Sequence, residues 1–285
     1  MRKLLKYEMR AMNRRLFPIY IGMLGVAILN FFFGIGTLVD TDPFFVYHME
    51  ALPDPLYHIV TMLQILIIML FFGLLVGMVV IWLLTTINRF RKGLLGEEGY
   101  LMFTLPVTTG RLIGAKLLGA SIHLVLATLV ALLSFFAMMG PPMLKELFAL
   151  DLFGMFRDLT RNFPTWPLIV LEFVLLLVFS VFKSILNFYL AIALGHLSNR
   201  HRTLLSIAAY IGIAAALSML TSLFFSGLTV LEMTGVFDPI ARMFMNEPQL
   251  AVHVTLITFT LLTVLQCVIF WFPTRYILKN RLNLE

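Results

Sequence analysis

Residues able to do chemistry are sparse in this chain, and they form no familiar catalytic motif. The sequence has no H-E-x-x-H zinc pattern, no G-x-S-x-G nucleophile turn and no G-x-x-x-x-G-K-[ST] phosphate loop. His196 and His201 are not spaced as a usual helical ligand pair, so we interpret them as interface residues. The single cysteine, Cys267, excludes a disulfide or a cysteine-based metal site within one chain. We therefore expect no catalytic, cofactor-binding or metal site here.

Polar residues inside the long apolar runs are the remaining candidates. Glu172 and Lys183 lie on nearly the same face of one helix, but the helical rise separates them by about 16 Å, too far for a direct pair. Two interpretations stay open for them: a role in a transport pathway or in helix pairing, or side chains that extend to the membrane surface. Ser218 and Thr221 share a helical face with two later serines. That face either lines a pathway or hydrogen-bonds to its own helix.

The amino-acid composition indicates whether the chain lies in water or in a lipid bilayer. Of the 285 residues, 60% are hydrophobic and only 13% are charged, and the mean hydropathy is +0.96. Soluble domains carry about 25% charged residues, and a soluble fold of this length has no interior large enough for so much apolar surface. The apolar runs are continuous rather than alternating, which favours helices over a barrel. The predicted fold class is an all-α membrane protein.

Six apolar runs are long enough to cross a bilayer, which takes about 20 residues. They cover residues 18–39, 57–87, 117–140, 167–194, 204–231 and 250–272. No segment between them is long enough to fold alone, so residues 1–285 are predicted to form a single transmembrane domain.

Two further segments are predicted to be amphipathic helices. In residues 1–16, Leu5, Met9, Met12 and Leu16 share one face and basic residues share the other. That pattern is typical of a helix lying in the membrane interface. Apolar residues of the stretch 144–159 also fall on one face, which predicts a helix on the outer surface.

The distribution of basic residues predicts the orientation. The N-terminus, the segment Arg89–Lys116, the short connection around Arg200 and the C-terminal tail together hold 16 of the 21 Lys and Arg residues. Basic segments stay in the cytoplasm, so both termini are expected there, in a multi-pass protein of the cell membrane. Topology explains the formal net charge of +6, and no nucleic-acid partner is expected.

The segment 88–116, between the second and third runs, is too polar for lipid. It carries seven charged residues, each costing roughly 2.5–3.5 kcal/mol at a bilayer centre. Gly93, Gly96 and Gly99 are expected to let the backbone reverse, because glycine accepts positive φ. Thr108 is expected to cap the helix that starts the next span.

Part of this segment resembles a known family. The run from Gly96 to Pro106 reads GEEGYLMFTLP, and it is followed by a basic residue and a span beginning at Ala115. This resembles the membrane (permease) subunits of the ABC-2 type transporter family, and the six predicted spans fit that family over the whole length.

The resemblance implies a function and a set of partners. It makes residues 88–116 a cytoplasmic coupling loop that docks on a separate ABC ATPase subunit, which binds ATP and Mg²⁺. It also implies a second permease subunit, identical or related, within membrane lipid. The function that the resemblance implies is then a non-enzymatic permease that exports an amphipathic or lipid-like compound or a peptide. The residues that it assigns to the ATPase contact are Glu97, Glu98, Gly99, Tyr100, Met102 and Phe103.

Two other classes stay open. An ATP-independent secondary transporter or channel needs ionisable residues near the midplane, where Lys183 is the candidate. A non-transporting membrane sensor or assembly protein is the third, although the chain has no extramembrane domain to support it.

Overall fold

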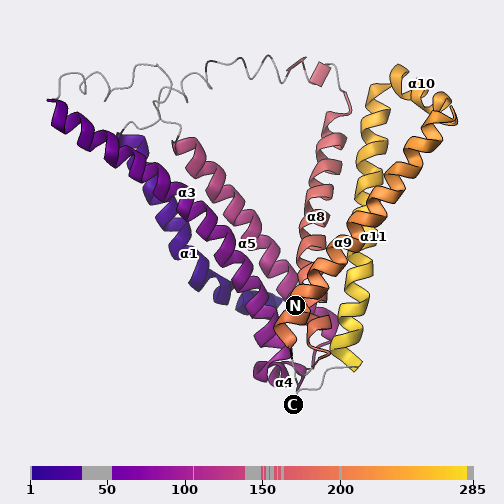
Figure 1. Ribbon diagram of the computed structural model, residues 1–285, viewed down its shortest axis with the longest axis horizontal. Helices are drawn as coiled ribbons and strands as arrows, with labels where there is room; N and C mark the ends of the chain where they lie inside the picture. Colours follow the sequence, from indigo (N-terminus) through magenta and orange to yellow (C-terminus); the bar gives the residue numbers. More distant parts are fainter. Residues whose placement is uncertain are drawn as a thin grey trace. The chain divides into compact units, whose positions relative to one another are not determined.

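The computed structural model describes residues 2–33, 53–104, 106–138, 164–198 and 201–280, with a few isolated positions between 149 and 161. Throughout these ranges the regular secondary structure is helical, without strands, as the sequence predicts (Figure 1). Six of the helices are long and apolar enough to cross a membrane. This is the architecture of a multi-pass helical membrane protein. The predicted helix over residues 144–159 lies mostly outside the described residues.

The chain forms two compact units. One combines Met1–Thr86 with Leu118–Phe156, and the other combines Ile87–Leu117 with Arg157–Glu285. Helix α3 (Asp54–Phe90) and helix α5 (Thr109–Met138) each contribute to both units. The prediction of a single transmembrane domain stays a prediction.

Helix α1 (Arg2–Phe33) belongs to the first unit and runs without interruption, with Pro18 inside it. Its buried positions recur every three or four residues along the whole helix: Glu8, Met12, Leu16, Tyr20, Met23, Ala27 and Asn30. Pro18 is exposed, so the buried face passes it undisturbed. The structure therefore has one helix where the sequence predicted an interfacial helix over 1–16 and a separate span over 18–39. The depth of residues 1–16 in a membrane stays a prediction.

Polar side chains hold the first unit together by donating to carbonyls of α5. The Tyr20 hydroxyl donates to the His123 carbonyl over 3.1 Å, and Asn30 Nδ2 donates to the Met138 carbonyl over 3.0 Å. Both contacts advance in the same direction along the two helices, so α1 and α5 run parallel. The indole of Trp82, on α3, donates to a third α5 carbonyl over 3.1 Å. Such bonds satisfy donors that have no water partner inside a membrane.

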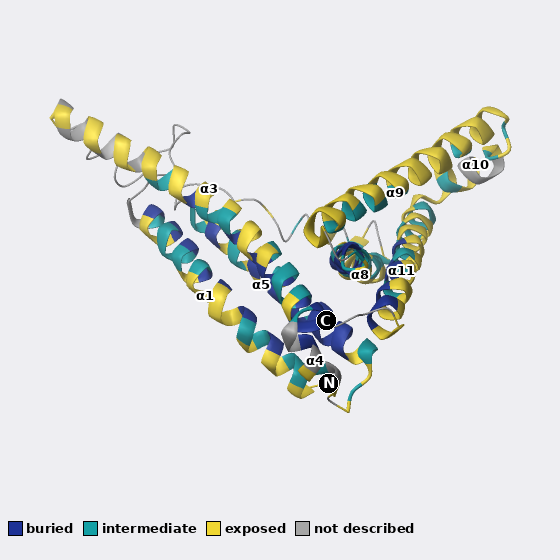
Figure 2. Ribbon diagram, turned by 60° about the horizontal axis from the view of Figure 1, so that its bottom comes forward, coloured by how far each residue is buried: buried dark blue, intermediate teal, exposed yellow. Residues whose placement is uncertain are grey.

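In the second unit, α8 (Trp166–Gly195) and α11 (Pro248–Asn280) lie side by side and parallel. Helix α9 (Arg202–Met233) returns antiparallel to α8, with the rings of Phe188 and Tyr210 stacked 4.8 Å apart. No residue of α9 is buried in the single chain, and Figure 2 shows its surface almost entirely exposed. An apolar helix exposed in this way needs lipid or another subunit around it.

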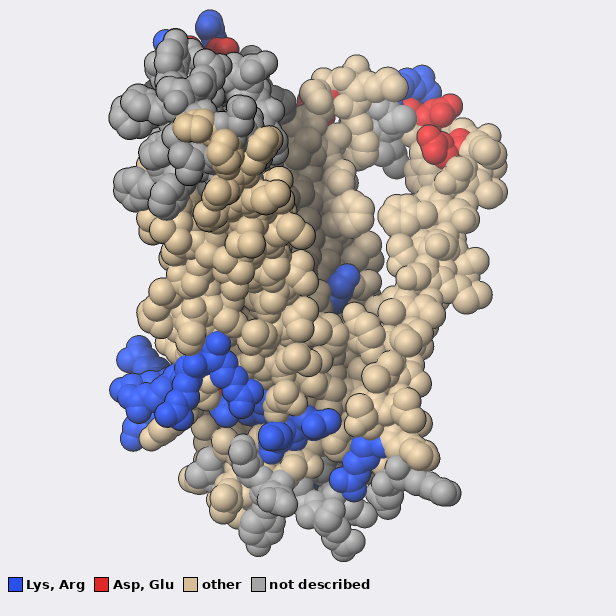
Figure 3. Space-filling model, turned by 60° about the vertical axis from the view of Figure 1, so that its left-hand side comes forward, with Lys and Arg blue, Asp and Glu red and all other residues tan. Residues whose placement is uncertain are grey.

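Charge is separated along the second unit. Its described basic residues mostly stand where α8 and α11 end and α9 begins, whereas Glu232, Asp238 and Glu247 stand where α9 ends and α11 begins. Figure 3 draws the charged side chains of one face, with Lys and Arg in blue and Asp and Glu in red. Lys183, within α8, is an exception.

Several helices differ from the predicted spans at their ends. Helix α11 reaches Asn280 rather than residue 272, with Pro273 inside, and a helix that was not predicted, α10 (Asp238–Asn246), joins α9 to α11. Pro239 and Pro248 occupy the first turns of α10 and α11. Proline fits there because the first amides of a helix have no helical partner.

The turn between α8 and α9 generates a test. A Cβ added to Gly195 would overlap Ser206 and lie 2.6 Å from its backbone nitrogen and 2.7 Å from the Arg202 carbonyl oxygen. Gly195→Ala should therefore destabilise the protein by about 1–3 kcal/mol. Thermal unfolding in detergent measures this.

The matched control is Gly212→Ala on α9, where an added Cβ meets nothing within 4 Å. It should leave the melting temperature unchanged or raise it slightly, because alanine favours a helix over glycine. Equal losses for both variants would contradict the assigned packing of the turn.

Candidate coupling segment and polar residues of the spans

The segment predicted as a coupling loop is mostly helical. Helix α3 continues into a π-helical turn, η1 (Arg91–Leu95), and after Gly96 the chain forms α4 (Glu97–Thr104). Helix α5 already begins at Thr109, with the Thr108 carbonyl accepting the amides of Arg111 and Leu112 over 2.9 and 3.3 Å. The predicted coupling loop is thus helical over most of its length, because charged residues are excluded from lipid but not from helices; its cytoplasmic side and its coupling role stay predictions. Capping by the Thr108 hydroxyl stays a prediction.

The glycines act differently from expectation. Gly93 lies in η1 and Gly99 in α4, and within the described residues only Gly235 has a positive φ. The chain turns at Gly96 with φ −105° and ψ −168°, which is extended backbone. A Cβ on Gly96 would lie 3.1 Å from the carbonyl oxygen of Lys92. Glycine is needed there for a close approach of two backbone segments, rather than for a left-handed conformation.

Buried contacts anchor the segment within the second unit. The ring of Phe90 stacks on Tyr189 of α8 with centroids 4.0 Å apart and planes 10° apart, and Phe90 is fully buried. Leu94 and Leu95 of η1 are buried as well. Lys116, only 4% exposed, donates from Nζ to the Arg89 carbonyl over 3.1 Å. This bond links the two helices that lead into and out of α4.

All six residues assigned to the ATPase contact belong to helix α4, whose backbone the structure describes. The side chains of Glu97, Glu98, Tyr100 and Phe103 lie outside the described residues. Of the other two, Gly99 is buried and Met102 is half-buried.

Among the described side chains of α4, Leu101 is apolar and 69% exposed, and sequence reasoning missed it. A helical wheel of α4 would have found it, because positions 97, 101 and 104 share a face.

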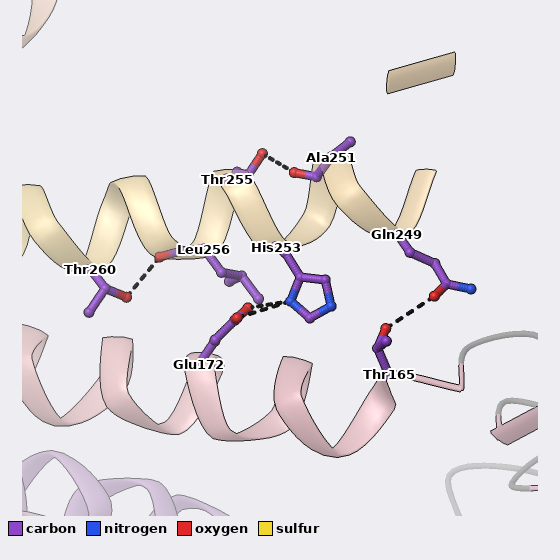
Figure 4. Close-up of polar contacts among 8 residues, drawn as sticks. All are labelled: Thr165, Glu172, Gln249, Ala251, His253, Thr255, Leu256 and Thr260. Atoms are coloured by element: carbon purple, nitrogen blue, oxygen red, sulfur yellow. Dashed lines mark hydrogen bonds and ion pairs between the residues drawn. The ribbon is translucent and has the colours of Figure 1, made fainter. Parts of the chain in front are cut away.

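Glu172 has a partner that the sequence did not suggest. The Nδ1 atom of His253, on α11, lies 2.9 Å from both carboxylate oxygens of Glu172 (Figure 4). The two residues are 81 apart in the chain. Nearer the helix starts, the Thr165 hydroxyl donates to Gln249 Oε1 over 3.1 Å. The contact joins α8 to α11, and a role of Glu172 in a pathway stays a prediction.

The other candidates of the spans are not brought together with this pair. Lys183 is half-buried on α8. Among the described residues it forms no ion pair. Ser218 and Thr221 are exposed on α9. The Thr221 hydroxyl donates to the Leu217 carbonyl over 2.7 Å, which is the own-helix bond left open above.

His196, at the end of α8, is held in one tautomer by a backbone carbonyl. Its Nδ1 lies 2.9 Å from the Ile192 carbonyl, which only accepts, so this nitrogen carries a hydrogen. Burial lowers the pKa of His196, the Ile192 carbonyl opposes that shift, and the positive charges of Arg202 and Arg91 lower the pKa further. The imidazole is therefore neutral near pH 7.

Comparisons with known proteins returned no matching family model, curated protein or solved structure. The resemblance to ABC-2 permeases thus depends on residues 96–106 and on the span pattern, and it stays a prediction.

The Glu172–His253 contact predicts a measurable coupling. In a double-mutant cycle of Glu172→Ala and His253→Ala, followed by thermal unfolding, the coupling energy should be about 0.6 kcal/mol and at most roughly 1.7 kcal/mol, as for other contacts between membrane helices. The same cycle with Glu172→Ala and Thr255→Ala should give none, because Thr255 bonds its own helix. Additive losses for Glu172 and His253 would contradict the contact.

His196 predicts a pH dependence of stability. Because its pKa is lower in the folded chain, the unfolded chain binds more protons between that value and the usual histidine pKa near 6.5. Stability is therefore present above about pH 6.5 and falls as the pH drops through that window. His196→Asn, which can keep the donor to Ile192, should flatten this dependence in melting-temperature profiles. His201→Asn, at an exposed neighbour, should not; equal flattening would contradict the assignment.

Proposed function

We propose that this chain is the permease subunit of an ATP-driven transporter of the ABC-2 type, exporting an amphipathic or lipid-like compound or a peptide. The sequence has no phosphate-binding loop, so the ATPase, with its ATP and Mg²⁺, is a separate chain. In this proposal the protein lies in the cell membrane with both termini in the cytoplasm. It pairs with a second permease subunit, identical or related.

The observation that carries the proposal is α4 itself. It is a short helix, Glu97–Thr104, placed between two candidate spans and bearing the GEEGYLMF motif. Gly96 separates it from η1, while the Lys116–Arg89 bond ties together the helices on either side. A short helix between two connected helices is suited to transmitting a displacement from a docked ATPase to the membrane spans.

The docking surface combines an apolar side chain with carboxylates. Leu101 is exposed, and the register of α4 places position 97 one turn before it on the same face. In the proposed complex Leu101 enters a groove of the ATPase, with Tyr100, Met102 and Phe103 around it. Glu97 and Glu98 pair with basic residues at the rim of that groove.

The route from this surface to the spans follows contacts of the second unit. Movement of α4 reaches α8 through the stack of Phe90 on Tyr189, and it reaches α5 through Lys116. ATP binding and hydrolysis would then switch the spans between inward-facing and outward-facing arrangements, which is alternating access.

The ATP-independent alternative has less support. It depends on ionisable residues near the midplane. Glu172 is engaged with His253, and both residues stand near the starts of their helices, so the pair is placed for helix packing. Lys183 is the candidate that remains for this alternative.

The proposal predicts that the chain co-purifies from its native host with a P-loop ATPase and that α4 is needed for this. Glu97→Lys, Tyr100→Ala and Leu101→Asp should each lower the yield of the ATPase at least several-fold, because they remove a charge pair or an apolar contact. Quantitative mass spectrometry of the tagged chain measures the ratio.

Leu197→Asp is the matched control, since Leu197 is an exposed leucine of the turn between α8 and α9. It should keep the ATPase ratio, and all variants should insert at the wild-type level. A ratio unchanged by the three α4 variants would overturn the docking assignment.

A further inference from the structure

The second unit contains an open pocket that the coupling proposal does not use. It has a volume of about 240 Å³ and lies where η1, the turn after α8 and the first turn of α9 meet. The residues that matter in its lining are Arg91, Lys92, Gly96, His196, Arg202 and Thr203.

Three cations converge on this pocket from two distant segments of the chain. Arg91 and Lys92 come from η1, and Arg202 is the first residue of α9. Within the described residues, the structure records no ion pair between them and a carboxylate. The positive charges of Arg91 and Arg202 are close enough to lower the pKa of His196. Like charges gathered in this way are unfavourable, and a bound anion would relieve the repulsion.

The donors suit an anion with several oxygens. A guanidinium presents paired N–H groups that match a phosphate. Thr203 also lines the pocket and adds its hydroxyl. The first backbone hydrogen bond of α9 runs from the Leu205 amide to the His201 carbonyl over 2.9 Å, so the Thr203 amide lies before it in the chain. Free amides at the start of a helix favour negative charge.

The position of the pocket indicates where the anion comes from. Its lining residues stand at the ends of three candidate spans: Ile65–Leu95, Trp166–Gly195 and Arg202–Met233. The ends of spans lie at the depth of lipid headgroups, whichever side of the membrane they face. Basic pockets between helices at this depth are suited to phospholipid phosphates.

We propose that this pocket binds a phosphate group, supplied by an anionic phospholipid. Bound there, the phosphate would link η1 to the start of α9 and stabilise the turn beside α4. The proposal does not depend on coupling to an ATPase. Free inorganic phosphate has the same chemistry and is the second source to be tested.

The test uses the purified full-length chain in detergent and its melting temperature. Mixed micelles with phosphatidylglycerol, mixed micelles with phosphatidylcholine, and inorganic phosphate are titrated separately. We expect phosphatidylglycerol to raise the melting temperature saturably, with a much smaller effect of phosphatidylcholine. The double variant Arg91→Gln/Arg202→Gln should weaken the apparent affinity for phosphatidylglycerol at least ten-fold.

Two further variants separate this site from general attraction and from misfolding. Arg111→Gln/Lys279→Gln removes the same charge at exposed helix ends outside the pocket and should keep the affinity. Arg91→Lys/Arg202→Lys keeps the charge and should retain most of it, which shows that the fold survives substitution.

Four outcomes would overturn the proposal. Equal losses for the two double glutamine variants would mean non-specific attraction, and no loss for either would remove the pocket from lipid binding. Saturation by inorganic phosphate without an effect of phosphatidylglycerol would assign the pocket to a free anion instead of a lipid. If neither anion binds and only the ATPase yield falls in Arg91→Gln/Arg202→Gln, the pocket serves a protein partner.

Discussion

A polar group in hydrocarbon must find its partner within the protein, and this requirement explains most of the specific contacts in the described structure. In the first unit, the side chains of Tyr20, Asn30 and Trp82 donate hydrogen bonds to backbone carbonyls of α5. In the second unit, Glu172 and His253 satisfy each other between α8 and α11. Because apolar packing alone barely distinguishes one helix pair from another in lipid, such contacts choose which helices are neighbours.

The same requirement shapes the polar stretch between the second and third spans. The charged residues of this stretch are excluded from the hydrocarbon, but the flanking helices extend beyond their apolar runs. Helix α3 continues into η1, and α5 starts at Thr109. The chain reverses in the short space around α4. Phe90 and Lys116 then fix the base of that reversal, one by stacking on Tyr189 and the other by a bond to a backbone carbonyl. These two contacts connect the residues on either side of α4 to α8 and to each other.

Features that repeat along the chain were predictable from the sequence. The fourth span, predicted over residues 167–194, is α8, Trp166–Gly195, because Pro167 and the following polar turn delimit its apolar run. Of the apolar face predicted for residues 1–16, Met12 and Leu16 are buried, whereas Leu5 and Met9 are half-buried. The short helices α4 and α10 were missed, because both lie in the connections between predicted spans, where no helix was sought. The role of Gly96 was misjudged because a close approach to Lys92 cannot be seen from composition.

The amino-acid sequence by itself determined the class of protein, the number of spans and the segregation of basic residues, because hydropathy and charge are local properties that add along the chain. Only the tertiary structure decided that Glu172 pairs with His253, that Leu101 is exposed on α4, and that Arg91 and Arg202 share a pocket. These outcomes depend on which helix faces which and on the rotation of each about its axis. Contacts between residues far apart in the chain set both, and no local pattern encodes them.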